Sequence, residues 1–177
     1  TSFFVGRGSF TGSIYATRPG TAVGLLRSTD GGQTWEVLNR TGFGGQVIND
    51  IEVTAAGVLL VATNGGAAAG AGLFRSTNAG NTFDDLSVTT AGDATPFPAR
   101  PVTDVVFDPV DATRFYAAVP GQGIFVSTSS GAHWTAVNGG LGAGNNPTDT
   151  VDNDGDGAPD EADEGYFSGA QRIKLAI

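Results

Sequence analysis

The 177-residue chain has 28 glycines and no cysteine, a composition that excludes disulfides and cysteine metal sites and favours short strands joined by tight turns. Its formal net charge is -9, and the nine Lys and Arg residues are scattered without an aromatic platform, which argues against a nucleic-acid partner. No apolar run approaches the roughly 18 residues of a membrane helix, so we expect no membrane span.

Residues 1–40 are expected to form a first unit of short strands separated by turns rich in Gly, Ser and Pro. An apolar segment at residues 3–5 opens the unit. Later strands are expected at residues 14–17, 22–27 and 35–38. The order is strand, turn, strand, turn, strand, turn, strand.

Two further units, residues 45–90 and 101–138, repeat this order. Their expected strands are residues 47–53, 58–63, 73–75 and 83–88 in the second unit, and 102–107, 114–119, 124–126 and 134–137 in the third. The small residues at 64–72 are expected to form a low-complexity linker. A long insertion at residues 139–169 follows, and the alternation in residues 170–177 resembles the first strand of a fourth unit.

Four short antiparallel strands per unit are typical of a β-propeller blade. The sequence therefore predicts an all-β fold, a propeller segment of about three four-stranded blades plus the first strand of a fourth. Because a ring normally needs four to eight blades, we expect the ring to be completed by further blades from the same polypeptide or from another chain.

An eight-residue motif recurs in the three units, starting at Ser28, Ser76 and Ser127, at intervals of 48 and 51 residues. The residues at its first, third, fifth and eighth places are Ser28, Asp30, Gly32 and Trp35; Ser76, Asn78, Gly80 and Phe83; and Ser127, Ser129, Gly131 and Trp134. This regularity marks each copy as a structural turn rather than a catalytic site.

The chemistry of the motif is local. Asp30 is placed to accept backbone N–H bonds within the turn, and Gly32 permits a positive φ. Trp35 is expected to fold back into the blade as a large apolar plug. Asn78 and Ser129 can accept the same bonds as Asp30, less strongly because they carry no charge.

The motif resembles the Asp-box, or BNR, repeat, whose pattern is Ser/Thr-x-Asp-x-Gly-x-Thr-Trp in a β-propeller, and residues 28–35 match it fully. This family includes sialidases, xyloglucan-cleaving glycosidases, sortilin-type receptor domains and photosystem II assembly factors. The resemblance thus implies a fold and leaves function open. Asp50 and Asp104 occupy matching places and could form the carboxylate pair of a glycosidase, although the repeat itself explains the match more simply.

Residues 152–163 (DNDGDGAPDEAD) have the spacing of a calcium loop and resemble a thrombospondin type 3 repeat. The glycine that the sharp turn needs is Gly157. The expected oxygen ligands are Asp152, Asp154, Asp156, the carbonyl of Ala158, Asp160 and Asp163. The alternative interpretation is a solvated acidic loop without an ion.

Taken together, these features predict a non-enzymatic module with a structural calcium site, serving protein or glycan interaction or assembly. Because calcium sites of modest affinity suit near-millimolar calcium, we expect an extracellular, cell-surface or periplasmic location. The rim that carries the calcium loop and the linker at residues 64–72 is the expected partner face. The alternative is part of an extracellular glycoside hydrolase, sialidase-like or xyloglucanase-like, and no catalytic residue is assigned.

Overall fold

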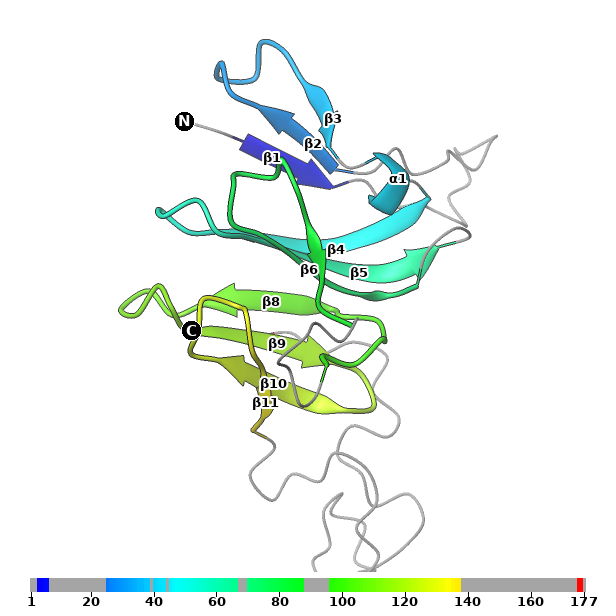
Figure 1. Ribbon diagram of the computed structural model, residues 1–177, viewed down its shortest axis with the longest axis vertical. Coiled ribbons are helices and arrows are strands. Elements are labelled where there is room, and N and C mark those ends of the chain that lie inside the picture. The colour runs from blue at the N-terminus through cyan, green and yellow to red at the C-terminus, as the bar shows by residue number, and fades with distance from the viewer. Residues whose placement is uncertain are drawn as a thin grey trace, which may run out of the picture. The chain divides into compact units, whose positions relative to one another are not determined.

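The computed structural model describes residues 3–6, 25–38, 40–43, 45–66, 70–87, 96–137 and 175–176. The chain divides into two compact units, Thr1–Val102 and Thr103–Ile177. The described elements, labelled in Figure 1, are β1 (Phe3–Gly6), β2 (Leu25–Ser28), β3 (Glu36–Leu38), α1 (Arg40–Phe43), β4 (Gln46–Val53), β5 (Leu59–Gly66), β6 (Gly72–Ser76), β7 (Asp84–Asp85), β8 (Asp104–Phe107), β9 (Phe115–Val119), β10 (Gly123–Ser127) and β11 (Thr135–Ala136). None of the described helices has the length and apolar character to cross a membrane.

The first unit contains two antiparallel sheets, with strand orders β1-β2-β3 and β4-β5-β6-β7. Each is a simple meander, because strands that are consecutive in the chain are neighbours in the sheet. In β4, the register against β5 shifts between Gln46 and Ile48 and again between Ile48 and Asp50.

The two sheets of the first unit share one hydrophobic core. Its buried members are Leu25, Leu38, Phe43, Ile48, Leu59, Val61 and Phe74, with Ile51 and Phe83 packed against it. Phe43, from the single helical turn α1, meets Phe74 and Phe83 edge to face, with ring centroids 5.0 and 4.9 Å apart. Aromatic rings favour this geometry because a positive ring edge meets a negative ring face.

The second unit contains one four-stranded antiparallel sheet in the order β11-β10-β9-β8. Val105, Phe115, Ala117 and Val119 are fully buried. In β8 and β9, the register pairs Asp104 with Ala118 and Val106 with Tyr116. The sheet repeats the meander of the β4–β7 sheet.

The predicted all-β fold, a β-propeller segment of short antiparallel meanders, is confirmed. The linker predicted at residues 64–72 is wrong in part, because β5 continues to Gly66 and β6 begins at Gly72. The Thr63 hydroxyl explains this continuation, since it donates to the Gly72 carbonyl and accepts from the Gly72 N–H, both at 3.1 Å. Helix α1 was not predicted. The strand expected at residues 14–17 and the insertion at 139–169 lie outside the described residues.

Candidate functional site

Turn 1 (residues 28–35) joins β2 to β3 and is held by its own polar side chains. The Gly32 N–H donates to Ser28 Oγ at 2.8 Å, and the Ser28 hydroxyl donates to Asp30 Oδ1 at 2.9 Å. Asp30 also accepts the Thr34 N–H at 2.9 Å and the Thr34 hydroxyl at 2.5 Å. Two side-chain oxygens therefore satisfy backbone donors that the turn leaves without a strand partner.

Turn 2 (residues 76–83) joins β6 to β7 and has the same two bonds from backbone N–H groups. The Gly80 N–H donates to Ser76 Oγ at 2.9 Å, and the Thr82 N–H donates to Asn78 Oδ1 at 2.9 Å. Asn78 Nδ2 donates to Thr82 Oγ1 at 2.8 Å, where Asp30 instead accepts from its threonine. The amide of Asn78 thus replaces the carboxylate of Asp30, and the bond between this side chain and the threonine hydroxyl runs in the opposite direction.

Turn 3 (residues 127–134), between β10 and β11, keeps the two backbone bonds with hydroxyl groups. The Gly131 N–H donates to Ser127 Oγ at 3.0 Å, and the His133 N–H donates to Ser129 Oγ at 2.9 Å. A serine hydroxyl is therefore long enough to take the place of Asp30 as an acceptor of the backbone bond.

The backbone of all three turns enters the left-handed region at two consecutive places. At the fifth place, φ is 93° for Gly32, 86° for Gly80 and 78° for Gly131. At the fourth place φ is also positive, at 80° for Gly31, 56° for Ala79 and 54° for Ser130. Ala79 and Ser130 adopt it at a cost, because their Cβ atoms crowd the backbone there.

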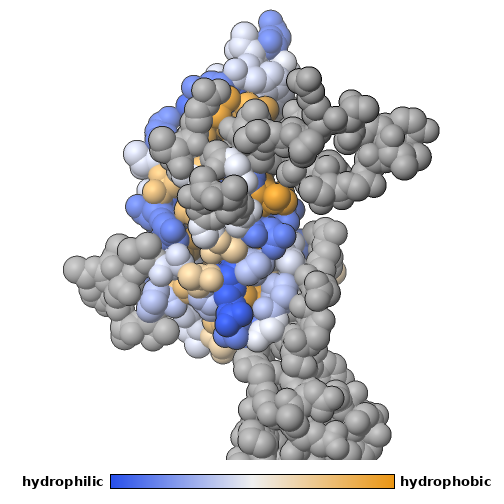
Figure 2. Space-filling model, turned by 90° about the vertical axis from the view of Figure 1, so that its right-hand side faces the viewer, coloured by the Kyte–Doolittle hydropathy of each residue, from blue (hydrophilic) through white to orange (hydrophobic). Residues whose placement is uncertain are grey.

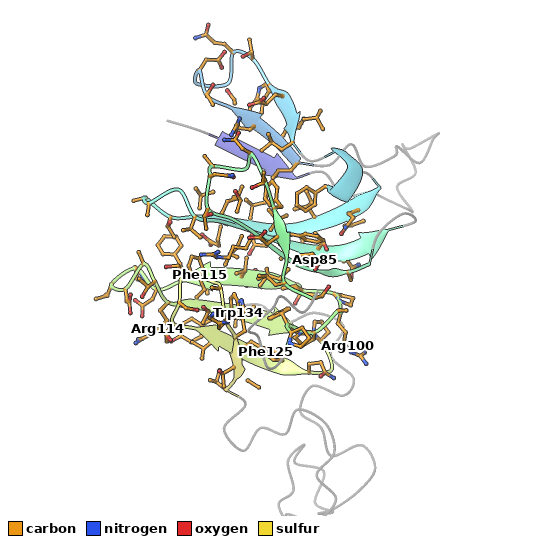
Figure 3. The ribbon with its side chains drawn as sticks, viewed as in Figure 1. Asp85, Arg100, Arg114, Phe115, Phe125 and Trp134 are labelled. Carbon is orange, nitrogen blue, oxygen red and sulfur yellow. The ribbon has the colours of Figure 1, made fainter. Side chains whose placement is uncertain are left out.

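The aromatic residues at the eighth place have different surroundings. Phe83 packs against the core through Phe43, and Trp134, labelled in Figure 3, is half-buried. Trp35 is 44% exposed, so the expected apolar plug is wrong for this residue. Its indole N–H instead donates to the Gly32 carbonyl at 3.1 Å, which holds the ring beside its own turn.

The charge of Asp30 is stabilised by the turn. The pKa of its carboxyl is lowered to about 2, first by the Thr34 hydroxyl and then by the Thr34 N–H. Both bonds favour the ionised form because donors stabilise the negative charge. Asp30 is thus a charged structural acceptor at neutral pH.

One arginine connects the β1–β3 sheet to turn 2. Arg27 on β2 pairs with Glu36 on β3 at 2.7 Å, and its guanidinium also donates to the carbonyl of Ala79 in turn 2. The arginine therefore joins neighbouring sheets of the first unit through a backbone acceptor, a contact that the sequence motif alone did not indicate.

Turn 3 is attached to the loop between β8 and β9. The Ser130 N–H donates to the Thr113 carbonyl at 2.8 Å. Within that loop, the Thr113 hydroxyl donates to Asp111 Oδ1 at 2.6 Å, which is the main reason that the pKa of Asp111 is lowered. Arg114, labelled in Figure 3, pairs with Asp108 at 3.5 Å.

Asp50 and Asp104 occupy matching register positions on β4 and β8, since each is paired with an alanine, Ala62 or Ala118, on the following strand. Asp50 Oδ1 accepts the N–H of Ile51 at 2.9 Å. Asp104 is 2% exposed, and its Oδ2 accepts the N–H of Leu175 at 2.6 Å. Each carboxylate therefore accepts a hydrogen bond from a backbone N–H group. The two residues belong to different units of the chain.

The six predicted calcium ligands between residues 152 and 163 all lie outside the described residues. In the part of the chain that the structure describes, no group of three or more His, Cys, Asp or Glu side chains could hold a metal ion.

The second unit contains a cavity of about 410 Å³ that the sequence did not indicate. Its lining residues are Val106, Asp108, Tyr116, Ile124, Val137, Leu175 and Ala176. Alternating apolar residues in the third unit predicted strands, but alternation within these strands cannot show that Leu175 and Ala176, far along the chain, line a pocket beside them.

Comparisons with known proteins return solved structures only, since no family model and no curated protein match the chain. The GH74 xyloglucanase from Xanthomonas campestris is 21% identical over 78% of this chain and 22% of its own, with a TM-score of 0.48. The GH74 enzyme from Niastella koreensis is 23% identical over 64% and 18%, with a TM-score of 0.42. A structure of YCF48 bound to D1 peptide is 17% identical over 66% and 35%, with a TM-score of 0.41. The chain spans about a third or less of the length of each of these proteins.

Proposed function

We propose that the chain is an Asp-box (BNR) propeller module that acts without catalysis in protein or glycan interaction or assembly, outside the cell, at its surface or in the periplasm. The observation that carries the proposal is the shared geometry of the three turns. In each turn, the side chains at the first and third places accept backbone N–H bonds of the same turn. Polar groups used in this way stabilise the fold.

The surface offers a mixed chemistry for such a role. On the face that Figure 2 shows, hydrophobic residues among those described are interspersed with hydrophilic ones. Non-obligate protein interfaces have this mixed character.

The experiment for this role measures binding and turnover on the same sample. Mobility in native gels cast with xyloglucan or with a sialylated glycoprotein reports retention, and reducing-sugar and sialic-acid release report cleavage. Retention without release supports the module. Release that scales with enzyme concentration would overturn it.

Calcium binding by residues 152–163 is part of the proposal, and it is supported by the spacing of the ligands in the sequence. The negative charge of this segment at neutral pH would be neutralised by the ion, because closely spaced carboxylates repel one another. We expect a dissociation constant on the order of 10⁻⁴ to 10⁻³ M, as in extracellular modules.

The calcium test compares thermal melting with added calcium and with chelator in the native chain and in Asp156→Asn. Asp149→Asn is the matched control, since it removes one charge just outside the twelve loop positions. A calcium-dependent rise in Tm that disappears only in Asp156→Asn, with calorimetric binding to match, supports the site. Equal melting with and without calcium refutes it.

A glycoside hydrolase is the second candidate. Because that reaction needs carboxylates, Asp50 and Asp104 are each tested. The variants Asp50→Asn and Asp104→Asn, with the exposed Asp84→Asn as control, are assayed for release of sugar after circular dichroism has verified folding. Turnover that both variants lose and the control retains would favour the hydrolase.

A further inference from the structure

Asn64 and Gly65 lie near the end of β5 without a partner in the register of the sheet. Strand β5 runs between β4 and β6 (Figure 1). On the β4 side, the register passes from Thr63 to Gly66 over one intervening residue of β4, Val47. On the β6 side, the pairing extends no further than Thr63. Two residues of β5 therefore face one residue of β4, as in a β-bulge, which interrupts the ladder locally.

The backbone at Gly65 requires a glycine. Its φ is 78°, in the left-handed region that residues with a Cβ atom rarely adopt. A Cβ atom built there would also lie 3.1 Å from the backbone nitrogen of Ala71. Both observations exclude an unstrained side chain at this position, so the local fold of β5 keeps a glycine directly after Asn64.

The side chain of Asn64 is free to approach this glycine. It is exposed, and its carboxamide makes no hydrogen bond to the residues that the structure describes. An exposed side chain changes rotamer rapidly. Because Gly65 has no Cβ atom to shield its backbone nitrogen, the Asn64 Cγ atom can reach that nitrogen within the same chain. Reactions between groups held this close have high effective concentrations.

The other asparagines among the described residues are held or shielded. Asn78 Oδ1 accepts the Thr82 N–H at 2.9 Å, and its Nδ2 donates to Thr82 Oγ1 at 2.8 Å. Asn49 Nδ2 donates to the Val102 carbonyl at 2.7 Å. Asn81 is exposed, but the residue that follows it is Thr82, whose N–H is already donated. These residues are internal controls for the asparagine of β5.

We propose that Asn64 and Gly65 form a self-modification site, at which the folded chain converts this asparagine to aspartate and isoaspartate without an enzyme. The Gly65 nitrogen gives up its proton and bonds to Asn64 Cγ. The bond from Cγ to the amide nitrogen breaks, and ammonia leaves with that proton. Water then opens the cyclic imide: cleavage at Cγ gives aspartate, and cleavage at the main-chain carbonyl gives isoaspartate. Water is the only reagent consumed.

The two products change β5 differently. Each adds a negative charge at neutral pH, because a carboxyl group replaces an amide. Isoaspartate also routes the main chain through the side-chain carbonyl, which lengthens the backbone by one methylene group. This lengthening falls between Thr63 and Gly66, the two residues whose pairing with β4 flanks the site. The isoaspartyl form is therefore expected to have a lower Tm than Asn64→Asp, which carries the charge alone.

The test is a time course of the folded chain in warm, mildly alkaline buffer, read by peptide mapping with mass spectrometry. A second Asn-Gly pair, at residues 138–139, makes assignment to individual peptides necessary. Asn64 is expected to convert roughly tenfold or more faster than Asn78 or Asn81, giving both products. Asn64→Gln is the matched variant, since it keeps an amide but must close a larger ring, and conversion at residue 64 should stop.

Unfolding in guanidinium chloride separates the contribution of the fold from that of the sequence. There Asn78 should react faster than in the folded chain, because its hydrogen bonds to Thr82 are lost, whereas the rate at Asn64 should change little. An Asn64 that reacts only after unfolding would overturn the proposal, because β5 would then protect it. Aspartate without isoaspartate would overturn the cyclic route. An isolated isoaspartyl form that melts with Asn64→Asp would refute the predicted effect on β5.

Discussion

The fourth place of each turn offers a direct test of the shared geometry, because Gly31, Ala79 and Ser130 all have positive φ there. Replacing Ala79 with glycine removes about 1–2 kcal/mol of left-handed strain. The added freedom of glycine in the unfolded chain costs about 0.5–1 kcal/mol in return. The midpoints of these two ranges differ by about 0.75 kcal/mol, so the free energy of unfolding should rise by about that amount in Ala79→Gly, or Tm by about 2–3 °C.

The reverse change, Gly31→Ala, should lower the free energy of unfolding by a similar amount. A Cβ built on Gly31 meets no atom within 4 Å, so the loss reflects backbone strain and no clash. Gly70→Ala is the control, since its Cβ also meets nothing within 4 Å and its φ is not left-handed. The measurement is urea unfolding followed by circular dichroism. A loss of stability in Ala79→Gly, or an unchanged Gly31→Ala, would refute the assigned backbone geometry.

Three further outcomes are expected. Phe43→Ala should cost about 3–5 kcal/mol in unfolding free energy. Phe43→Leu, which keeps most of the apolar volume and loses two edge-to-face contacts, should cost about 1–3 kcal/mol; losses below 1 kcal/mol in both would contradict the core assignment. Because the folded pKa of Asp30 is lowered to about 2, its contribution to stability is present above the unfolded value near 4 and is lost as pH falls toward 2. Asp30→Asn should flatten that part of the pH–stability curve, and the difference should shrink with salt since Asp30 is exposed; an unchanged curve would count against the bonds from Thr34. Arg27→Ala should lower Tm, whereas Arg100→Ala, at an exposed position, should not; equal melting of both variants would show that Arg27 adds nothing to the first unit.

The sequence predicted the strands well where a strand alternates and ends at a serine. Ser28, Ser76 and Ser127 each close a strand and begin a turn, so the motif locates β2, β6 and β10. Features that depend on distant partners were less accessible. Helix α1 is only four residues long, too short for a periodic pattern of apolar residues. Phe43 is buried because its ring packs against Phe74 and Phe83, which lie far along the chain. The 44% exposure of Trp35 depends on which residues pack against it, which a local pattern cannot indicate.

The three turns also explain why the motif tolerates loss of its aspartate. The backbone N–H at the seventh place needs one oxygen acceptor, and Asp30, Asn78 and Ser129 supply a carboxylate, an amide and a hydroxyl at 2.9 Å each. The donor is satisfied by any of the three groups, so the charge adds strength without being required. A residue that catalysed a reaction could not be exchanged in this way, because an amide or a hydroxyl cannot replace the proton affinity of a carboxylate. The interchange among copies therefore favours a structural role for the motif, and it directs the search for function to surfaces outside the turns.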